Sequence, residues 1–133
     1  VVLHFYRQAT YNQEIKVFGT YKGINAGEHQ RDFVHVDDCV QLMLEMYEKF
    51  VGGIFNVGTG EAYSYNYLAK CVQRLINSEI KYIPFPDKLK GKYQIYTRAD
   101  MNKVRKSGFI TKFRPLNEGI NDYVEFLRIS KQS

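Results

Sequence analysis

Cysteine is scarce in this sequence, which has only Cys39 and Cys71 among its 133 residues. Both lie in helix-like segments, and neither has the Cys-x-x-Cys spacing or the group of nearby histidines that a zinc site needs. Two distant cysteines also make a poor disulfide framework, because small secreted domains build theirs from several pairs. We therefore expect two reduced, buried thiols in a cytoplasmic protein, and no metal site.

Long hydrophobic runs are missing as well. No apolar stretch approaches the roughly 18 residues of a membrane-spanning helix. The first residues, "VVLHFYRQAT", lack the basic, apolar and small-residue order of a signal peptide. We expect no membrane partner. The sequence begins without methionine inside an apolar, helix-like pattern, which favours a chain that is part of a longer protein.

Common cofactor and nucleophile motifs are also absent. There is no phosphate-binding loop ending in Gly-Lys-Ser or Gly-Lys-Thr, no Gly-x-Ser-x-Gly and no His-Glu-x-x-His. In "GTGEAY", Gly58 and Gly60 match the first two glycines of a dinucleotide fingerprint, but Tyr63 stands where a third small residue is needed. A glycine turn before a helix capped by Ser64 explains this stretch better. Any cofactor fingerprint is therefore expected outside this sequence.

The composition is that of a folded domain with an anionic partner. Hydrophobic residues make up 44% of the chain and aromatic residues 15%, which is enough apolar material for one core. The net charge is +5 and the isoelectric point is near 9.1. Small molecules that carry phosphate fit this charge as well as nucleic acid does. Because the basic residues are spread along the sequence without one stripe, we do not expect nucleic acid as the partner.

Helical and extended patterns alternate along the chain without repeats. This alternation predicts an α/β protein with parallel strand pairing. Helices are expected at 1–12, from 37 or 38 onward, at 64–76, near 99–107 and near 115–129, and strands at 15–18, 31–36, 52–60 and 80–85.

The helix after residue 36 shows the clearest pattern. Asp37 or Asp38 is suited to accept backbone N–H bonds as its N-cap. Its apolar positions form a stripe broad enough for a buried helix: Val40, Leu42, Met43, Leu44, Met46 and Tyr47.

One stretch, "RDFVHVDD" (31–38), places an arginine at the entry of a strand and paired carboxylates at a helix start. By chance alone, it could be an exposed Arg31 beside an Asp37 cap. The stretch nevertheless resembles a recurrent element of the extended short-chain dehydrogenase/reductases, the family of nucleotide-sugar epimerases and dehydratases. "GIFNVGTG" (53–60) after the next helix is similar to that family too. The resemblance implies that Arg31 faces a substrate pyrophosphate, and a guanidinium fork suits phosphate oxygens.

A second stretch narrows the resemblance. "YIPFPDKLKGKYQIYTRAD" (82–100), followed by "MNKVRKSGF", resembles the C-terminal region of the ADP-heptose epimerases within this family. The similarity covers essentially the whole chain and only the last part of such an enzyme. It implies that residues 1–133 are a C-terminal substrate-binding region, with some elements that complete the Rossmann sheet of an absent N-terminal NADP-binding domain. We expect such a fragment to expose an apolar patch around Val57 and the helix at 64–76.

Site residues follow from the resemblance position by position. It implies substrate contacts for His4 on the first helix, for the segment after the first strand, for Arg31, and for a tyrosine near the nucleotide diphosphate. The residues in these positions are His4, Phe18, Gly19, Thr20, Tyr21, Arg31 and Tyr93. The stretch "GTYKGINAGEHQ" (19–30) is longer than the family's usual loop.

Each of these residues has a simpler alternative. His4 could be an ordinary helix histidine, Phe18 a core residue, and Tyr93 one of eleven tyrosines. Near Tyr93, Pro84 and Pro86 fix φ on either side of Phe85. A stiff, basic and aromatic loop of this kind would make a suitable wall for an ADP-sugar.

The activity implied by the resemblance is epimerisation of an ADP-heptose at C6, by transient oxidation with bound NADP, in lipopolysaccharide core biosynthesis. Such enzymes use a tyrosine with a lysine four residues later, and no tyrosine here has that lysine. We therefore expect no catalytic residue in this chain and no activity from it alone. The implied partners are the ADP-heptose, the N-terminal domain and other subunits of a homo-oligomer, a pentamer in the family. Alternatives are another nucleotide-sugar epimerase or dehydratase, and a non-enzymatic basic binding module.

Overall fold

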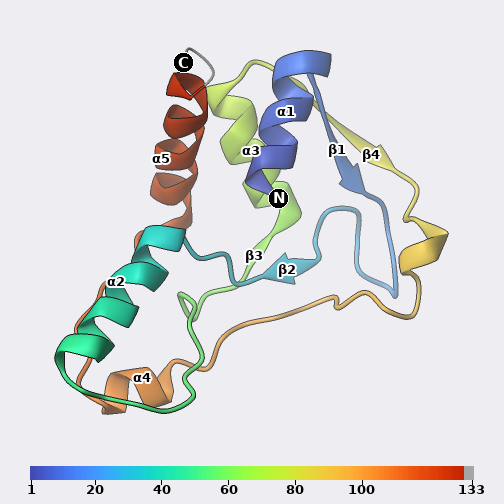
Figure 1. The fold of residues 1–133 in the computed structure, drawn as a ribbon. Helices are drawn as coiled ribbons and strands as arrows, with labels where there is room; N and C mark the ends of the chain where they lie inside the picture. The colour runs from blue at the N-terminus through green and yellow to red at the C-terminus, as the bar shows by residue number, and fades with distance from the viewer. Residues whose placement is uncertain (131–133) are drawn as a thin grey trace.

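The chain folds as an α/β protein, as predicted. A computed structural model describes residues 1–130, so the last three residues of the predicted region 1–133 lie outside the described part. The helices are α1 (Val2–Asn12), α2 (Val36–Glu48), α3 (Tyr65–Leu75), α4 (Asn102–Lys106) and α5 (Leu116–Ile129), with one 3-10 turn, η1 (Asp87–Leu89). The strands are β1 (Glu14–Phe18), β2 (Gln30–Arg31), β3 (Tyr63–Ser64) and β4 (Glu79–Ile83). Figure 1 shows these elements in order along the chain.

Parallel pairing is confirmed for β1 and β4. Ile15 lies opposite Ile80 and Val17 opposite Tyr82 in this pair. Ile15 and Val17 are fully or almost fully buried while Lys16 between them is exposed, because successive side chains of a strand point to opposite faces. Helices α1, α3 and α5 pack together beside this pair (Figure 1).

The first core lies between these three helices and the parallel pair. Leu68 and Val72 of α3 are its centre, and both are completely buried. Its buried members are Phe5, Tyr6, Ala9, Ile15, Val17, Leu68, Ala69, Cys71, Val72, Leu116, Ile120 and Val124. The predicted helices at 1–12, 64–76 and 115–129 are confirmed, and Ser64 caps α3 by accepting the backbone N–H of Tyr67. Because α3 is buried here, the prediction that it forms an exposed patch is wrong.

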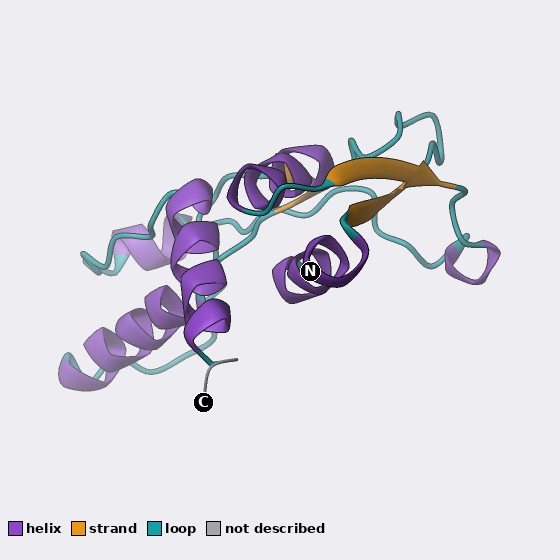
Figure 2. Cartoon of the chain, turned by 90° about the horizontal axis from the view of Figure 1, so that it is seen from above, coloured by secondary structure: helices purple, strands orange, loops and turns teal. Residues whose placement is uncertain are grey.

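A second, smaller core lies between α2 and α4, which Figure 1 labels at the other end of the molecule from α1 and α3 and Figure 2 shows from above. Its buried residues are Leu42, Met101, Val104 and Phe109. Partly buried side chains, including Phe55 and Val57, pack around them. The short helix predicted near 99–107 is thus confirmed as α4, and Val57 belongs to this core rather than to an exposed surface.

Two predicted strands are wrong. The strand expected at 31–36 ends at Arg31, because Asp32 turns its carboxylate to the backbone of Thr59 and Gly60. The strand β2 pairs with β3 in antiparallel fashion, which the sequence patterns did not indicate. No strand forms at 52–60, where Gly53 has a φ of 132° and Gly60 a φ of 80°. Neither value is compatible with a regular strand.

The predicted N-cap of α2 is also wrong. His35 caps this helix, since its Nδ1 accepts the backbone N–H of Asp37 at 3.2 Å. Asp37 and Asp38 lie in the first turn, where their charge favours the positive end of the helix dipole. Asp38 instead pairs with Arg114, the residue that precedes the turn into α5.

The burial predicted for α2 is wrong as well. Leu42 is its one fully buried apolar side chain, and Met46 is partly buried. Val40, Met43, Leu44 and Tyr47 are between 42% and 79% exposed. Phe50 and Ile54, which follow α2, are 93% and 89% exposed. The exposed apolar surface therefore lies on α2 and the segment after it. Separately, none of the helices within residues 1–130 has the length and apolar character needed to cross a membrane.

Candidate functional site

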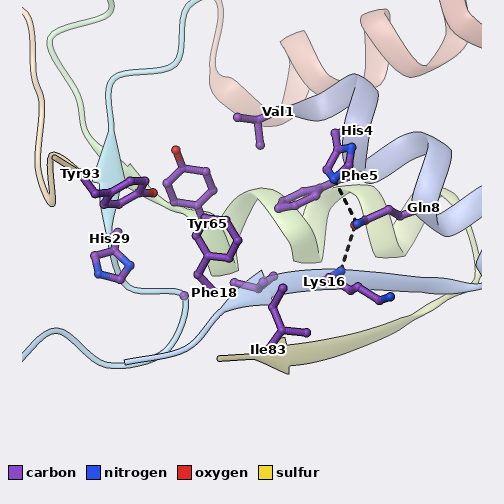
Figure 3. Close-up of a pocket in the computed structure, with 12 residues that line it drawn as sticks. Val1, His4, Phe5, Gln8, Lys16, Phe18, His29, Tyr65, Ile83 and Tyr93 are labelled. Atoms are coloured by element: carbon purple, nitrogen blue, oxygen red, sulfur yellow. Dashed lines mark hydrogen bonds between the residues drawn. The ribbon is translucent and has the colours of Figure 1, made fainter. Parts of the chain in front are cut away.

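A cavity of about 320 Å³ opens between α1, β1, α3 and the loop after β4. Figure 3 shows His4 and Gln8 of α1 on one side, Tyr93 and His29 on the other, and Phe18 and Tyr65 between them. Of the predicted site residues, His4, Phe18 and Tyr93 line this cavity. Gly19, Thr20, Tyr21 and Arg31 are not among its lining residues. The cavity therefore brings together part of the predicted set from three distant segments.

The α1 side of the cavity is held by a short polar chain. The Nε2 atoms of His4 and Gln8 lie 3.1 Å apart, and Oε1 of Gln8 accepts the backbone N–H of Lys16 at 3.0 Å. Because that carbonyl group accepts from Lys16, the Gln8 amide is left to donate to the His4 ring. These two hydrogen bonds fix the exposed imidazole of His4 against β1, at the rim of the cavity (Figure 3).

Aromatic rings join the two loops beside the cavity. Tyr21 stacks on Phe85, with the ring centres 4.0 Å apart and the planes at 8°. The hydroxyl of Tyr21 also accepts the backbone N–H of Gly91 at 2.6 Å. Phe18 lies edge-on to both Phe85 and Tyr93. The loop at 19–30 and the loop after β4 are therefore packed as one wall, which gives Tyr21 a place near the cavity without lining it.

Arg31 and Tyr93, which the resemblance places near a diphosphate, lie next to each other. The guanidinium carbon of Arg31 lies 4.9 Å from the centre of the Tyr93 ring, within the range of a cation–π contact. Nη1 donates to the carbonyl of Gln30 at 2.7 Å, and Nη2 donates to the carbonyl of Gln94. These contacts fix the plane of the guanidinium. Burial and the neighbouring Tyr65 hydroxyl raise the pKa of Tyr93, so its phenol stays protonated.

Asp32 connects three segments next to this pair. Its carboxylate accepts the backbone N–H groups of Thr59, Gly60 and Ala99 and the hydroxyl of Thr59, at 2.7 to 3.1 Å. Burial alone would raise the pKa of Asp32, but the hydrogen bonds outweigh it and lower that pKa. Asp32, the residue after Arg31, is therefore a charged anchor that joins its own loop to the segments around Thr59 and Ala99.

The glycines of "GTG", Gly58 and Gly60, let the backbone of this turn come close to the Asp32 carboxylate. A Cβ on Gly58 would come within 2.6 Å of both the Asp32 carboxylate and the Cβ of Ala99. This close approach, and the cap of α3 by Ser64, agree with the glycine turn favoured by the sequence analysis. The residues here do not fit a dinucleotide cradle, because Asp32 already occupies the donors of the turn.

The described part of the chain offers no metal centre. Within residues 1–130 there is no group of three or more histidine, cysteine, aspartate or glutamate side chains able to hold an ion. Cys39 and Cys71 are both free, and burial raises the pKa of each thiol. Cys71 is buried as predicted, whereas Cys39 is only partly so.

Three residues of this region were not expected from the sequence: His29, Tyr65 and the anchor Asp32. His29 and Tyr65 line the cavity, and His29 is only 1% exposed. Neither residue gave a signal in the sequence. The burial of His29 depends on the aromatic rings around it, and the position of Tyr65 depends on how the start of α3 lies against residue 29.

Comparison with known proteins agrees with the predicted resemblance. Residues 1–58 match the sequence model of the NAD dependent epimerase/dehydratase family. Over 127 residues the chain is 41% identical to the ADP-L-glycero-D-manno-heptose-6-epimerase of Alkalilimnicola ehrlichii, covering 94% of this chain and 40% of that protein. The chain thus spans about two fifths of the length of this curated relative.

Solved structures of two epimerases have a similar fold. The ADP-L-glycero-D-manno-heptose-6-epimerase of Helicobacter pylori is 26% identical with a TM-score of 0.78, over 96% of this chain and 37% of that one. The UDP-glucose 4-epimerase of Thermotoga maritima, solved with UDP-glucose, is 30% identical with a TM-score of 0.76, over 97% and 39% of the two chains. The predicted resemblance and the α/β fold are therefore confirmed.

Proposed function

Taking this chain as part of a protein of the NAD-dependent epimerase/dehydratase family, we propose that it is the substrate-binding region of an ADP-heptose 6-epimerase. The 41% identity to such an enzyme along 94% of the chain is the observation that carries the proposal. In the complete protein this region would pair with an N-terminal NADP-binding domain. The enzyme would interconvert ADP-D-glycero-D-manno-heptose and ADP-L-glycero-D-manno-heptose in the cytoplasm, for the lipopolysaccharide core, as a homo-oligomer.

The substrate would be bound in two places, with its diphosphate at the Arg31–Tyr93 pair and other parts of it in the cavity. A guanidinium has five N–H donors, and the carbonyls of Gln30 and Gln94 take two of them. The others are available to the oxygens of a diphosphate, which a planar fork can bind in pairs. His4, Phe18 and Tyr93 would contact the parts of the substrate that enter the cavity, with Gly19, Thr20 and Tyr21 shaping the wall beside it.

The chemical step would depend on a cofactor and catalytic residues held by the rest of the enzyme. Transient oxidation at C6 needs a nicotinamide cofactor, NADP in this proposal, and the family's dependence on such a cofactor supports it. This chain supplies neither a fitting dinucleotide cradle nor a tyrosine followed four residues later by lysine. Its role is to bind and orient the nucleotide-sugar, and alone it should be inactive and retain no NADP.

The proposal is tested with the complete enzyme and the isolated chain side by side. Each is incubated with ADP-D-glycero-D-manno-heptose, and the configuration at C6 is followed by NMR. We expect conversion by the complete enzyme alone. Conversion of UDP-glucose to UDP-galactose in preference to ADP-heptose would assign the chain to another sugar-nucleotide epimerase. Tight, salt-sensitive binding of arbitrary single-stranded nucleic acid, with no epimerisation, would favour the basic binding module instead.

A further inference from the structure

Two buried side-chain polar atoms lack a hydrogen-bond partner within residues 1–130: Nε2 of His29 and Oγ of Ser78. Ser78 lies just before β4, beside a polar hollow lined by Asn12, Glu14 and Lys81, where water can reach the neighbouring groups. His29 is buried more deeply than Ser78. It is 1% exposed and lines the cavity of the proposed substrate site.

The backbone of Tyr21 raises the pKa of the His29 imidazole, which is the effect of a carbonyl beside a ring N–H. With the proton assigned to Nδ1 on this ground, Nε2 keeps its lone pair, and Nε2 has no partner among the described residues. Burial lowers the pKa of His29, and the charge of Arg31 lowers it further, so the ring is neutral near pH 7. Nε2 is therefore a hydrogen-bond acceptor without a donor.

Three aromatic rings surround the imidazole: Tyr21, Phe85 and Tyr93, with ring centres 5.4 to 6.3 Å away. Only Tyr93 of these three also lines the cavity. It stands edge-on to His29 at 83°, and Figure 3 shows the two side chains next to each other at the same end of the cavity. Tyr93 is therefore the aromatic neighbour of His29 that a molecule in the cavity would also touch.

We propose that His29 is a specificity-determining residue of this site, whose Nε2 accepts a hydrogen bond from a hydroxyl or amino group of the bound nucleotide-sugar. The assignment rests on the proposed function for the identity of the ligand. Tyr93 turns aside as the ligand enters, and the ligand then supplies the donor that the protein lacks. A ligand without a donor at that position leaves Nε2 buried and unpaired, and the site discriminates against it for this reason.

A purely structural role for His29 predicts a different residue. A buried acceptor with no partner costs stability, and the imidazole lies among three aromatic rings. Phenylalanine would fill that space without an unpaired polar atom. If packing alone mattered, this substitution would improve stability and leave ligand binding unchanged. If the histidine serves the ligand, the same substitution raises stability and weakens binding, so the two quantities move in opposite directions.

The experiment measures both quantities on the complete enzyme. Calorimetry gives the Kd of ADP-heptose for the wild-type enzyme and for His29→Phe, His29→Gln and Ser78→Ala, and thermal unfolding without ligand gives the Tm of each. We expect His29→Phe to raise the Tm by about 2 °C or more and to weaken ADP-heptose binding roughly three- to tenfold, as for one neutral hydrogen bond. His29→Gln keeps an acceptor oxygen and should recover part of the affinity.

Ser78→Ala is the matched control, since it removes the other unpaired buried atom away from the cavity and should leave the Kd unchanged. A His29→Phe enzyme that binds ADP-heptose as tightly as the wild type overturns the inference. If that variant does not fold, the pair His29→Leu and His29→Gln makes the same comparison, and equal Kd values overturn it. A wild-type enzyme that binds neither ADP nor ADP-heptose refutes the proposed function itself, and the inference on His29 falls with it.

Discussion

The two cores of this chain are built in different ways. The first core buries the inner faces of α1, α3 and α5 against β1 and β4. The second core buries few side chains, and α2 leaves Val36, Val40, Met43, Leu44 and Tyr47 exposed. A helix with a strong apolar pattern can therefore be placed without burying that pattern.

Polar contacts place α2 instead. Near its start, Asp38 accepts from the backbone N–H and the Nε of Arg114 at 2.9 and 2.8 Å. Near its end, Glu45 accepts the backbone N–H groups of Ile110 and Thr111, both at 2.9 Å, and pairs with Lys49. These carboxylates fix the helix to the segment that leads into α5. The apolar face of α2 remains exposed within residues 1–130.

The largest expected effect compares one completely buried leucine from each core. Leu68→Ala in the first core should lower the free energy of unfolding by about 4 kcal/mol, and Leu42→Ala in the second by about 2.5 kcal/mol, because looser surroundings relax more around a cavity. Urea unfolding of the complete protein measures both. Equal losses, or a larger loss for Leu42→Ala, would mean that the second core is as tightly packed as the first.

The next effect concerns Arg31, which lies on the short strand that continues toward α2. Arg31→Ala in the complete enzyme should raise the KM for ADP-heptose about ten- to a hundredfold, since charge-assisted hydrogen bonds contribute roughly 1.5–3 kcal/mol. The kcat should change less, because the diphosphate lies away from the reacting C6. Lysine should restore only part of the loss. An unchanged KM with a lower Tm would make Arg31 a structural residue of the loops.

A smaller effect tests the junction between the cores, where Asp32 anchors the turn at Gly58. Gly58→Ala should cost about 2 kcal/mol, as overpacking does, because its Cβ would meet Asp32 and Ala99 at 2.6 Å. Gly52→Ala is the matched control, since a Cβ added at Gly52 would have nothing within 4 Å and the φ of this residue is not in the left-handed region. Thermal unfolding of both variants makes the measurement. A Gly58→Ala protein as stable as Gly52→Ala would contradict the close packing of this turn.

The smallest expected effect is the loss of one local contact, that of Glu45, at low pH. Hydrogen bonds from Lys49, then from Thr111 and Ile110, lower the pKa of Glu45 from 4.5 to about 2. A carboxylate with a lowered pKa stabilises the fold above its unfolded pKa and ceases to do so as the pH falls through the folded value. We therefore expect the contact between α2 and residues 108–111 to loosen between about pH 4.5 and pH 2. NMR shifts of Thr111 should follow this change, and Glu45→Gln should abolish it. A Thr111 signal that stays constant across this range would show that Glu45 is not the group responsible.

The elements of the first core could be predicted because local patterns and burial agree there. The period of α3, the Ser64 cap and the alternation of β1 all matched their environment. Around the second core the same kinds of pattern gave wrong predictions. The residues "GIFNVGTG" have the composition of a strand but no paired neighbour within residues 1–130, and α2 has the stripe of a buried helix without its cover. Sequence patterns describe the environment for which a segment is suited, and within residues 1–130 these two segments do not have that environment.

The resemblance supplied three of the residues that line the cavity, His4, Phe18 and Tyr93, whereas contacts between distant segments had no signal in the sequence. Arg31 and Tyr93 meet because β2 and the loop after β4 run together, with Gln30 donating its N–H to Ile95. Neither spacing nor charge in the sequence indicates that meeting. His29 was missed because burial gives it its chemistry, and nothing in its sequence neighbours reveals whether a histidine will be 1% exposed.

The hydrogen bond from the Gly91 amide to the Tyr21 hydroxyl joins two loops through a single exchangeable proton. That amide exchanges with solvent deuterium when this hydrogen bond opens. Its exchange rate therefore reports how often the contact between the loop at 19–30 and the loop after β4 is broken at this point, and a slower rate in the presence of a ligand would show that the ligand stabilises the contact.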